Sequence, residues 1–195
     1  MRTSAHVLQE NQAGWWHLQG VCSGLLLLCV VASEVWDAET KPIEFVCHKG
    51  MRRSLNIAAD MERALRSCNG SIMLSTPVQL PCVELHLTSW QNQTHQEKRG
   101  DILASLRLLS GSVKAARASD QPPCSASVLL RLENNINNYQ LIVTNLQLSQ
   151  GPAVTPALSC VPRDTPSVRT LLLSYHQLIS GKLERFMVEL KDRCP

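Results

Sequence analysis

Apolar residues recur every three or four positions along four stretches of the chain, which is the spacing of one face of an α-helix. The stretches are residues 45–67, 96–118, 125–148 and 166–191. In the last of them the apolar face consists of Leu172, Tyr175, Ile179, Leu183, Phe186 and Leu190. Polar and charged residues lie mostly on the opposite faces, so each stretch predicts an amphipathic helix that buries one side. The chain is therefore expected to be all-α.

Local signals refine two of these helices. Pro166 suits the first turn of the fourth helix, where a missing N–H group costs nothing, and Asp164 or Thr165 is expected to cap it. Gly111 lies inside the second helix and disfavours it by about 1 kcal/mol relative to alanine. The second helix is thus expected to be weakest in its middle.

The connections between the four helices have unequal lengths, covering residues 68–95, 119–124 and 149–165. Short connections join antiparallel neighbours, whereas long ones can return along a bundle and join parallel helices. A helix of about 23 residues is about 35 Å long, and the third connection can stretch to about 50 Å. The order long, short, long indicates an up-up-down-down four-helix bundle with two long crossover loops.

The N-terminal region carries a segment without charge, residues 21–32, that ends in small residues. It is too short to cross a hydrocarbon core, which needs about 20 residues, but it fits the apolar part of a secretory signal. Cleavage after Ala32 and cleavage after Ser33 both stay open, and a signal anchor is the alternative interpretation. We therefore expect a signal peptide in residues 1–33 and a secreted, extracellular domain in residues 34–195, with no membrane insertion of the mature chain.

The cysteines agree with secretion. Two of the eight, Cys22 and Cys29, lie in the predicted signal peptide. An even number of cysteines in a secreted chain predicts disulfides, but six cysteines allow 15 pairings and spacing does not choose among them. The six mature cysteines are Cys47, Cys68, Cys82, Cys124, Cys160 and Cys194.

Other candidate chemistry is sparse. The net charge of +3 and the lack of a long basic run do not indicate a nucleic-acid partner. No zinc-finger spacing and no HExxH, GxSxG or P-loop motif occurs, so we expect no enzyme, no metal site and no cofactor. Two sequons predict N-glycosylation at Asn69 and Asn92.

Three segments carry a resemblance to a known family. Residues 89–117 read SWQNQTHQEKRGDILASLRLLSGSVKAAR, residues 171–190 read LLLSYHQLISGKLERFMVEL, and residues 76–81 read TPVQLP. In order and spacing they resemble the erythropoietin/thrombopoietin family of long-chain four-helix cytokines, over roughly residues 47–194. The last helix of that family carries a Gly-Lys pair, here Gly181 and Lys182.

The resemblance implies two disulfides, Cys47–Cys194 and Cys68–Cys124. Once these are assigned, Cys82 and Cys160 remain, both in predicted crossover loops, and we expect them to form a third bridge. A cysteine before the third helix, Cys124, favours the thrombopoietin-like branch of the family over the erythropoietin-like branch.

The resemblance also implies a function as a haematopoietic cytokine that binds and activates a class I cytokine receptor through two separate surfaces. The thrombopoietin-like interpretation predicts action on the thrombocyte and megakaryocyte lineage. An erythropoietin-like red-cell cytokine is the alternative. A secreted helical carrier of an apolar ligand is a third hypothesis, because apolar stripes fit it equally well. The candidate receptor-binding residues are basic and lie on the fourth and first helices: Lys182, Arg185, Lys49, Arg52 and Arg53.

The position of two of these residues on the fourth helix can be estimated. At about 100° per residue, Lys182 falls about 60° and Arg185 about 120° from Ile179 on the apolar stripe. Both are therefore expected to reach solvent on one flank. Replacing Lys182 with Glu is expected to weaken receptor binding and to leave the fold intact.

Overall fold

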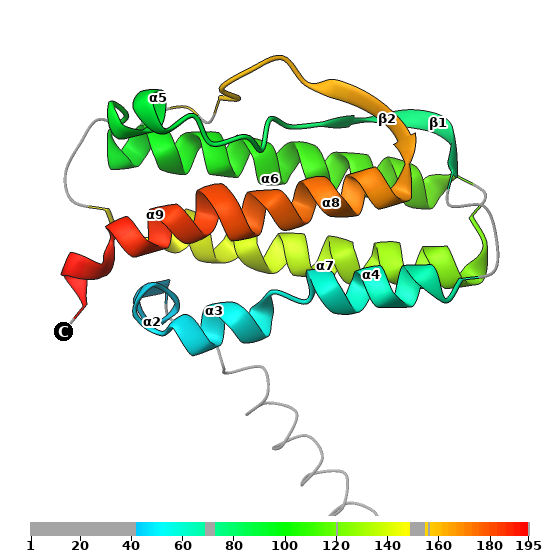
Figure 1. Ribbon diagram of the computed structural model, residues 1–195, viewed down its shortest axis with the longest axis horizontal. Helices are drawn as coiled ribbons and strands as arrows, with labels where there is room; N and C mark the ends of the chain where they lie inside the picture. The colour runs from blue at the N-terminus through cyan, green and yellow to red at the C-terminus, as the bar shows by residue number, and fades with distance from the viewer. Residues whose placement is uncertain (1–41, 69–72, 120, 149–154, 156, 195) are drawn as a thin grey trace, which may run out of the picture. The chain divides into compact units, whose positions relative to one another are not determined.

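The computed structural model describes residues 42–68, 73–119, 121–148, 155 and 157–194. Two of its helices are long and unbroken, α6 (His95–Ala118) and α7 (Pro123–Asn145), and they pack along each other (Figure 1). Thr94 begins α6 with a capping box, since its side chain accepts from the Glu97 N–H and Glu97 accepts from the Thr94 N–H. These two helices confirm the predicted second and third helices, and α6 continues through Gly111.

The predicted first helix is not continuous, and this prediction is wrong. The region consists of α2 (Pro42–Cys47), α3 (Lys49–Leu55) and α4 (Ala58–Arg66). The backbone leaves the helical conformation at Asn56, where φ is −81° and ψ is 85°. The Nδ2 group of Asn135 in α7 donates to the Leu55 carbonyl at 3.1 Å, so a side chain from another helix satisfies an acceptor near the break.

The fourth helix is also irregular. It comprises α8 (Val168–Leu178), a π-helical turn η1 (Ile179–Leu183), α9 (Glu184–Glu189) and a 3₁₀ turn η2 (Lys191–Arg193). It begins later than predicted, because Pro166 lies in a strand. Ser167, and neither Asp164 nor Thr165, caps the helix by accepting from the Thr170 N–H at 3.3 Å.

The long connections contain secondary structure that the sequence pattern did not predict. Strand β1 (Met73–Leu80) pairs antiparallel with β2 (Arg163–Ser167), and the short helix α5 (Leu87–Gln91) follows β1. The register places Val78 opposite Thr165 and Leu80 opposite Arg163. Strand β1 packs against α6 and β2 against α8, so the paired strands cover one side of the helices (Figure 1).

The core lies among the helices, and the predicted apolar stripes are confirmed. All six apolar positions predicted for the fourth helix are buried, with Phe186 and Tyr175 fully so. The inner side of β1 adds Leu74, Val78 and Leu80 to the same core.

Three disulfides tie this core together: Cys47–Cys194, Cys68–Cys124 and Cys82–Cys160, with Cα–Cα distances of 5.6, 5.7 and 6.0 Å. The first two connect helical regions, and the third joins the two crossover segments. These distances lie within the range that a disulfide requires.

Candidate functional site

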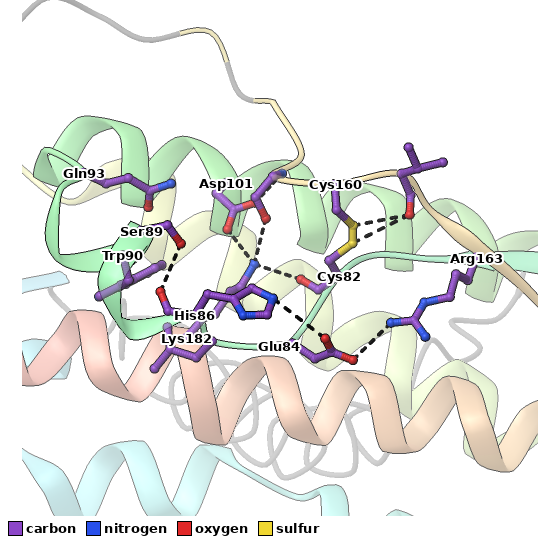
Figure 2. Close-up of a pocket in the computed structure, with 13 residues that line it drawn as sticks. Cys82, Glu84, His86, Ser89, Trp90, Gln93, Asp101, Cys160, Arg163 and Lys182 are labelled. Carbon is purple, nitrogen blue, oxygen red and sulfur yellow. Dashed lines mark hydrogen bonds and ion pairs between the residues drawn. A yellow bond between two sulfur atoms is a disulfide. The ribbon is translucent and has the colours of Figure 1, made fainter.

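Lys182 does not reach solvent, so that prediction is wrong. Its side chain is 3% exposed and its Nζ lies 2.7 Å from Asp101 Oδ2 of α6. Nζ also donates to the Cys82 carbonyl at 2.8 Å and to Ser159 Oγ at 3.1 Å (Figure 2). The three donors of the ammonium group therefore each have an acceptor. The helical spacing placed Lys182 beside the stripe correctly, but the crossover segments cover that flank of the helix.

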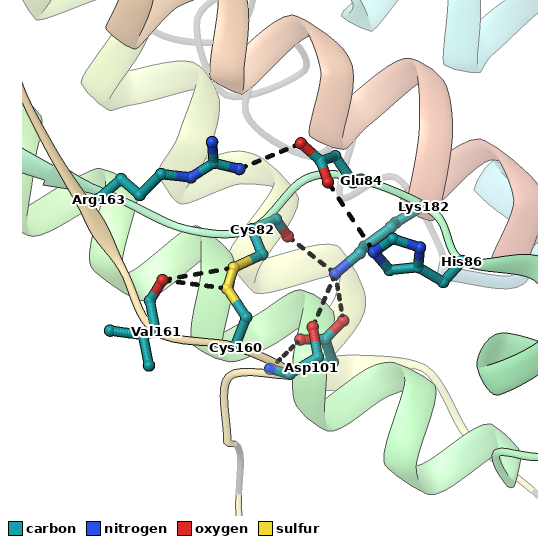
Figure 3. The surroundings of a disulfide bond; sticks show 9 residues. Cys82, Glu84, His86, Asp101, Cys160, Val161, Arg163 and Lys182 are labelled. Carbon is teal, nitrogen blue, oxygen red and sulfur yellow. Dashed lines mark hydrogen bonds and ion pairs between the residues drawn. A yellow bond between two sulfur atoms is a disulfide. The ribbon is translucent and has the colours of Figure 1, made fainter.

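We call this cluster the clasp: Lys182, Asp101, Ser159 and the carbonyl of Cys82. Asp101 also accepts from the Ser159 N–H at 3.0 Å, so its two oxygens bind both the ammonium group and the second crossover segment. The Cys82–Cys160 disulfide lies next to the same atoms (Figure 3). The clasp thus holds both crossover segments against α6 and the π-helical turn.

A pocket of about 280 Å³ opens beside the clasp, with Glu84, His86, Ser89 and Trp90 in its lining (Figure 2). Its outer part is polar and exposed, where Glu84 pairs with Arg163 at 3.1 Å. An exposed pair of this kind contributes little to stability.

Arg52 is the second predicted receptor-binding residue that is buried. Its Nε and Nη2 donate to the two carboxylate oxygens of Glu184 at 2.8 and 3.1 Å. Its Nη1 donates to the carbonyls of Phe45 and Val46 at 3.1 and 2.6 Å. A bidentate Arg–carboxylate pair fixes geometry as well as charge, so Arg52 joins α2 and α3 to the fourth helix. The expectation that Arg52 lies on an outward face is therefore wrong.

The other three predicted residues lie at the surface. Arg185 has a side chain that is 45% exposed, and its Nε donates to Glu189 Oε1 at 3.2 Å. Lys49 and Arg53 in α3 are exposed, and within the described part of the chain neither forms an ion pair or a side-chain hydrogen bond. The structure thus separates two scaffold cations from three accessible ones.

Glu189 holds the accessible Arg185 in place, and the sequence pattern did not single it out. It accepts from Trp90 Nε1 at 2.9 Å and from Lys98 Nζ at 2.8 Å, in addition to Arg185. Burial raises the pKa of the Glu189 carboxyl, but the hydrogen bonds from Lys98, Trp90 and Arg185 outweigh burial and bring the pKa below its usual value. Glu189 therefore remains ionised and orients Arg185.

A second pocket of about 250 Å³ lies between α3 and the π-helical turn, and we call it the notch. It is lined by Phe45, Lys49, Arg52, Arg53, Asn56, Tyr139, Ile179, Ser180, Leu183 and Glu184. Its apolar lining residues belong to the core, while two of its basic residues, Lys49 and Arg53, form no ion pair with any residue that the structure describes.

The predicted modification sites fall in different places. Asn92 is exposed at the end of α5, two residues before the Thr94 cap of α6, whereas Asn69 lies outside the described residues. The predicted signal peptide, residues 1–33, also lies outside them. Across the described residues, no group of three or more His, Cys, Asp or Glu side chains is placed to hold a metal ion. None of the helices described is both long and apolar enough to cross a membrane.

These features define a disulfide-bonded helical bundle with accessible basic groups at its surface. A family model described as erythropoietin/thrombopoietin matches residues 44–195, and the chain belongs to this family. Thrombopoietin from Rattus norvegicus is 31% identical over 165 residues, covering 84% of this chain and 49% of the relative. Thrombopoietins from Canis lupus familiaris and Mus musculus are 33% and 35% identical over 124 residues, 64% of this chain. The chain spans 49%, 34% and 33% of the lengths of these three relatives.

Proposed function

We propose that this chain is a secreted haematopoietic cytokine that binds and activates a class I cytokine receptor of the thrombopoietin-receptor type. Family membership carries the proposal, and the relatives it matches are thrombopoietins. The expected outcome is growth and differentiation of the thrombocyte and megakaryocyte lineage. An erythropoietin-like action on red cells is the alternative within the family.

We propose further that the helices run up-up-down-down. The Cys47–Cys194 bridge joins the beginning of the first helical region to the end of the last. The Cys68–Cys124 bridge joins the end of the first region to the beginning of α7. Both bridges support the first region running opposite to α7 and to the fourth helix. The short connection between α6 and α7 supports antiparallel packing of that pair.

The receptor-facing residues in this proposal are Arg185, Lys49 and Arg53. Their accessible cations complement an acidic receptor surface, which would speed association and add charge-assisted hydrogen bonds. Lys182 and Arg52 contribute indirectly, because each holds a segment that carries or borders the accessible cations. A substitution of either buried residue would therefore reduce binding through the fold.

Secretion is part of the same proposal. A signal peptide in residues 1–33 would deliver residues 34–195 to an oxidising compartment, where six cysteines pair. Glycans on Asn69 and Asn92 are expected there. N-terminal sequencing of the chain from the medium of expressing cells tests the cleavage, and amidase digestion should lower its apparent mass.

Growth of factor-dependent cells tests the activity. Cells that carry the thrombopoietin receptor should grow in response to the secreted chain, and the same cells without a receptor should not. Growth only of cells that carry the erythropoietin receptor would favour the alternative. No growth with either receptor would contradict a role as a cytokine of this family.

A further inference from the structure

The third disulfide differs from the other two in where its cysteines lie. Cys82 follows strand β1 and Cys160 precedes strand β2, so this bridge joins two extended crossover segments (Figure 3). The other two bridges are attached to helices, since Cys47 is the last residue of α2 and Cys124 is the second residue of α7. Opening the third bridge therefore removes no covalent link between helices.

The sulfur atoms of this bridge can be reached from outside. Both cysteines line the 280 Å³ pocket beside the clasp (Figure 2). Cys160 is exposed, and the next residue, Val161, is 84% exposed, so an approaching protein meets an open segment. In the part of the chain that the structure describes, the other four cysteines line neither this pocket nor the notch. Thiol–disulfide exchange requires a thiolate to reach one of the sulfurs, so access favours this bridge.

The charges in the pocket do not oppose such an attack. Arg163 pairs with Glu84 at 3.1 Å, and Lys182 pairs with Asp101 at 2.7 Å. The two cations in the lining therefore balance its two carboxylates. An incoming thiolate carries a negative charge, and a balanced lining does not repel it.

The product of reduction also fits the site. The Val161 carbonyl oxygen lies 3.3 Å from Cys160 Sγ and 3.7 Å from Cys82 Sγ (Figure 3). A carbonyl oxygen has two lone pairs, so it can accept from both S–H groups that reduction creates. The opened form thus finds an acceptor already in place.

The clasp supports the chain next to both cysteines. The Cys82 carbonyl accepts from Lys182, while Ser159, which precedes Cys160, accepts from Lys182 and donates to Asp101. The pairing of β1 with β2 joins the same two segments farther along. These contacts do not depend on the S–S bond, so we expect the opened form to remain folded.

We propose that Cys82–Cys160 is a thiol-exchange site, which the dithiol of a thioredoxin-type oxidoreductase opens to give a folded chain with two thiols. A thiolate of the oxidoreductase attacks Cys160 Sγ, the S–S bond breaks, and its electron pair passes to Cys82 Sγ, which takes up a proton. The second thiolate of the oxidoreductase then attacks its partner sulfur in the mixed disulfide. Cys160 leaves and takes up a proton, and the oxidoreductase becomes a disulfide. Two electrons have passed to the chain.

A dithiol suits this site better than a single thiol. Its second sulfur is held beside the mixed disulfide at a high effective concentration, whereas a monothiol needs a second encounter. The inference goes beyond the proposed function and does not depend on which receptor the chain binds.

The order of reduction tests the site. The secreted chain is incubated under native conditions with thioredoxin, its reductase and NADPH, thiols are trapped with N-ethylmaleimide, and peptides are mapped by mass spectrometry. Cys82 and Cys160 should be labelled at least tenfold faster than Cys68 and Cys124, the comparison pair because Cys124 is also exposed. Labelling of Cys82 and Cys160 that is absent, or no faster than that of the comparison pair, would overturn the proposal.

Reduced glutathione at the same thiol concentration separates the two sources of thiol. It should open the bridge at least tenfold more slowly than thioredoxin and leave its adduct on Cys160. Opening by glutathione as fast as by thioredoxin would overturn the dithiol as the partner. An adduct on Cys82 alone would overturn Cys160 as the sulfur that is attacked.

A filling substitution tests the route through the pocket. Ser89→Tyr places a ring in the lining, and Thr88→Tyr makes a similar change at the preceding exposed position of α5, outside the lining. After thermal melting has shown that both variants fold, Ser89→Tyr should slow opening by thioredoxin at least fivefold and Thr88→Tyr less than twofold. An unchanged rate for Ser89→Tyr would overturn the pocket as the route.

Hydrogen exchange tests the state of the opened form. Amide exchange should rise at least tenfold in β1 and β2 and stay within twofold in α6 and α7, because only the crossover segments lose a constraint. Equally faster exchange in all four elements, or loss of the helical circular dichroism signal, would overturn the folded dithiol form.

Discussion

The clasp and the notch each place a basic residue from the predicted receptor surface against a carboxylate, but the two sites are built differently. In the clasp, Lys182 and Asp101 have side chains that are 3% and 5% exposed, and every ammonium donor has an acceptor. In the notch, Arg52 is 3% exposed but Glu184 is 33% exposed, and beside this pair lie Lys49 and Arg53, which form no ion pair within the described ranges of the chain. A buried cluster in which every donor has an acceptor, such as the clasp, suits a structural role. A partly exposed site with accessible cations, such as the notch, suits binding. Basic residue type alone does not distinguish these roles.

The largest effect is expected when the clasp loses its cation. Lys182→Met leaves the Asp101 carboxylate buried with one backbone N–H donor, so the free energy of unfolding should fall by about 3–5 kcal/mol. Lys182→Glu would bring two carboxylates together, so the expectation that it leaves the fold intact is withdrawn. Urea unfolding followed by circular dichroism measures the change.

The matched control for that prediction removes both charges. The double variant Lys182→Met and Asp101→Leu should recover most of the lost stability, because no uncompensated charge remains. A single Lys182→Met variant as stable as the unaltered chain would show that the clasp does not carry the crossover segments.

A smaller effect is expected from the disulfide beside the clasp. Replacing Cys82 and Cys160 together with Ser should lower the free energy of unfolding by about 2–4 kcal/mol. The bundle should still fold, because the clasp and the pairing of β1 with β2 hold the same segments. The corresponding change at Cys47 and Cys194 provides the comparison, since that bridge connects chain regions far apart in sequence. Loss of all helical signal in the Cys82 and Cys160 variant would contradict independent support by the clasp.

The helical pattern predicted α6, α7 and the core because those features depend on spacing along the chain. Residues such as Phe186 and Leu183 fall on one stripe, and burial of that stripe requires no knowledge of neighbours. The break at Asn56 was not predictable in this way, because the Leu55 carbonyl beside it accepts a hydrogen bond from Asn135, which is far away in sequence. Strand β1 was missed for a related reason: its pairing partner is another crossover segment.

The candidate site shows the same division. The helical spacing placed Lys182 correctly, near the edge of the apolar stripe. Spacing along one helix could not show that the crossover segments cover Lys182. Asp101 was present in the segment that carries the family resemblance, so a signal for its importance existed. Glu189 had no comparable signal, because a carboxylate on the polar side of a helix usually faces solvent.

The carboxylate of the notch should matter less than the cation of the clasp. Glu184→Gln keeps an acceptor for Arg52, and the guanidinium group also retains the Phe45 and Val46 carbonyls. The free energy of unfolding should therefore fall by only about 1–2 kcal/mol, around the lower end of the values for hydrogen bonds to charged groups, because Glu184 is partly exposed. Glu62→Gln in α4, which loses an exposed pair with Arg66, should cost less than about 0.5 kcal/mol. A cost for Glu184→Gln equal to that of Lys182→Met would remove the distinction between the two sites.

The smallest effect concerns glycine, and it separates the regular helix from the irregular one. A Cβ atom added at Gly111 or at Gly181 would have no heavy atom within 4 Å, so alanine fits at both positions. Gly111 lies in the continuous α6, where alanine should stabilise the chain by about 0.5–1 kcal/mol. Gly181 lies in the π-helical turn beside the notch, where alanine gains less because the backbone is not that of an α-helix. Thermal melting of both variants should therefore show a higher Tm for Gly111→Ala than for Gly181→Ala. If Gly181→Ala instead raised the Tm more than Gly111→Ala, the turn would be relaxing toward an α-helix, and the notch would be expected to change shape with it.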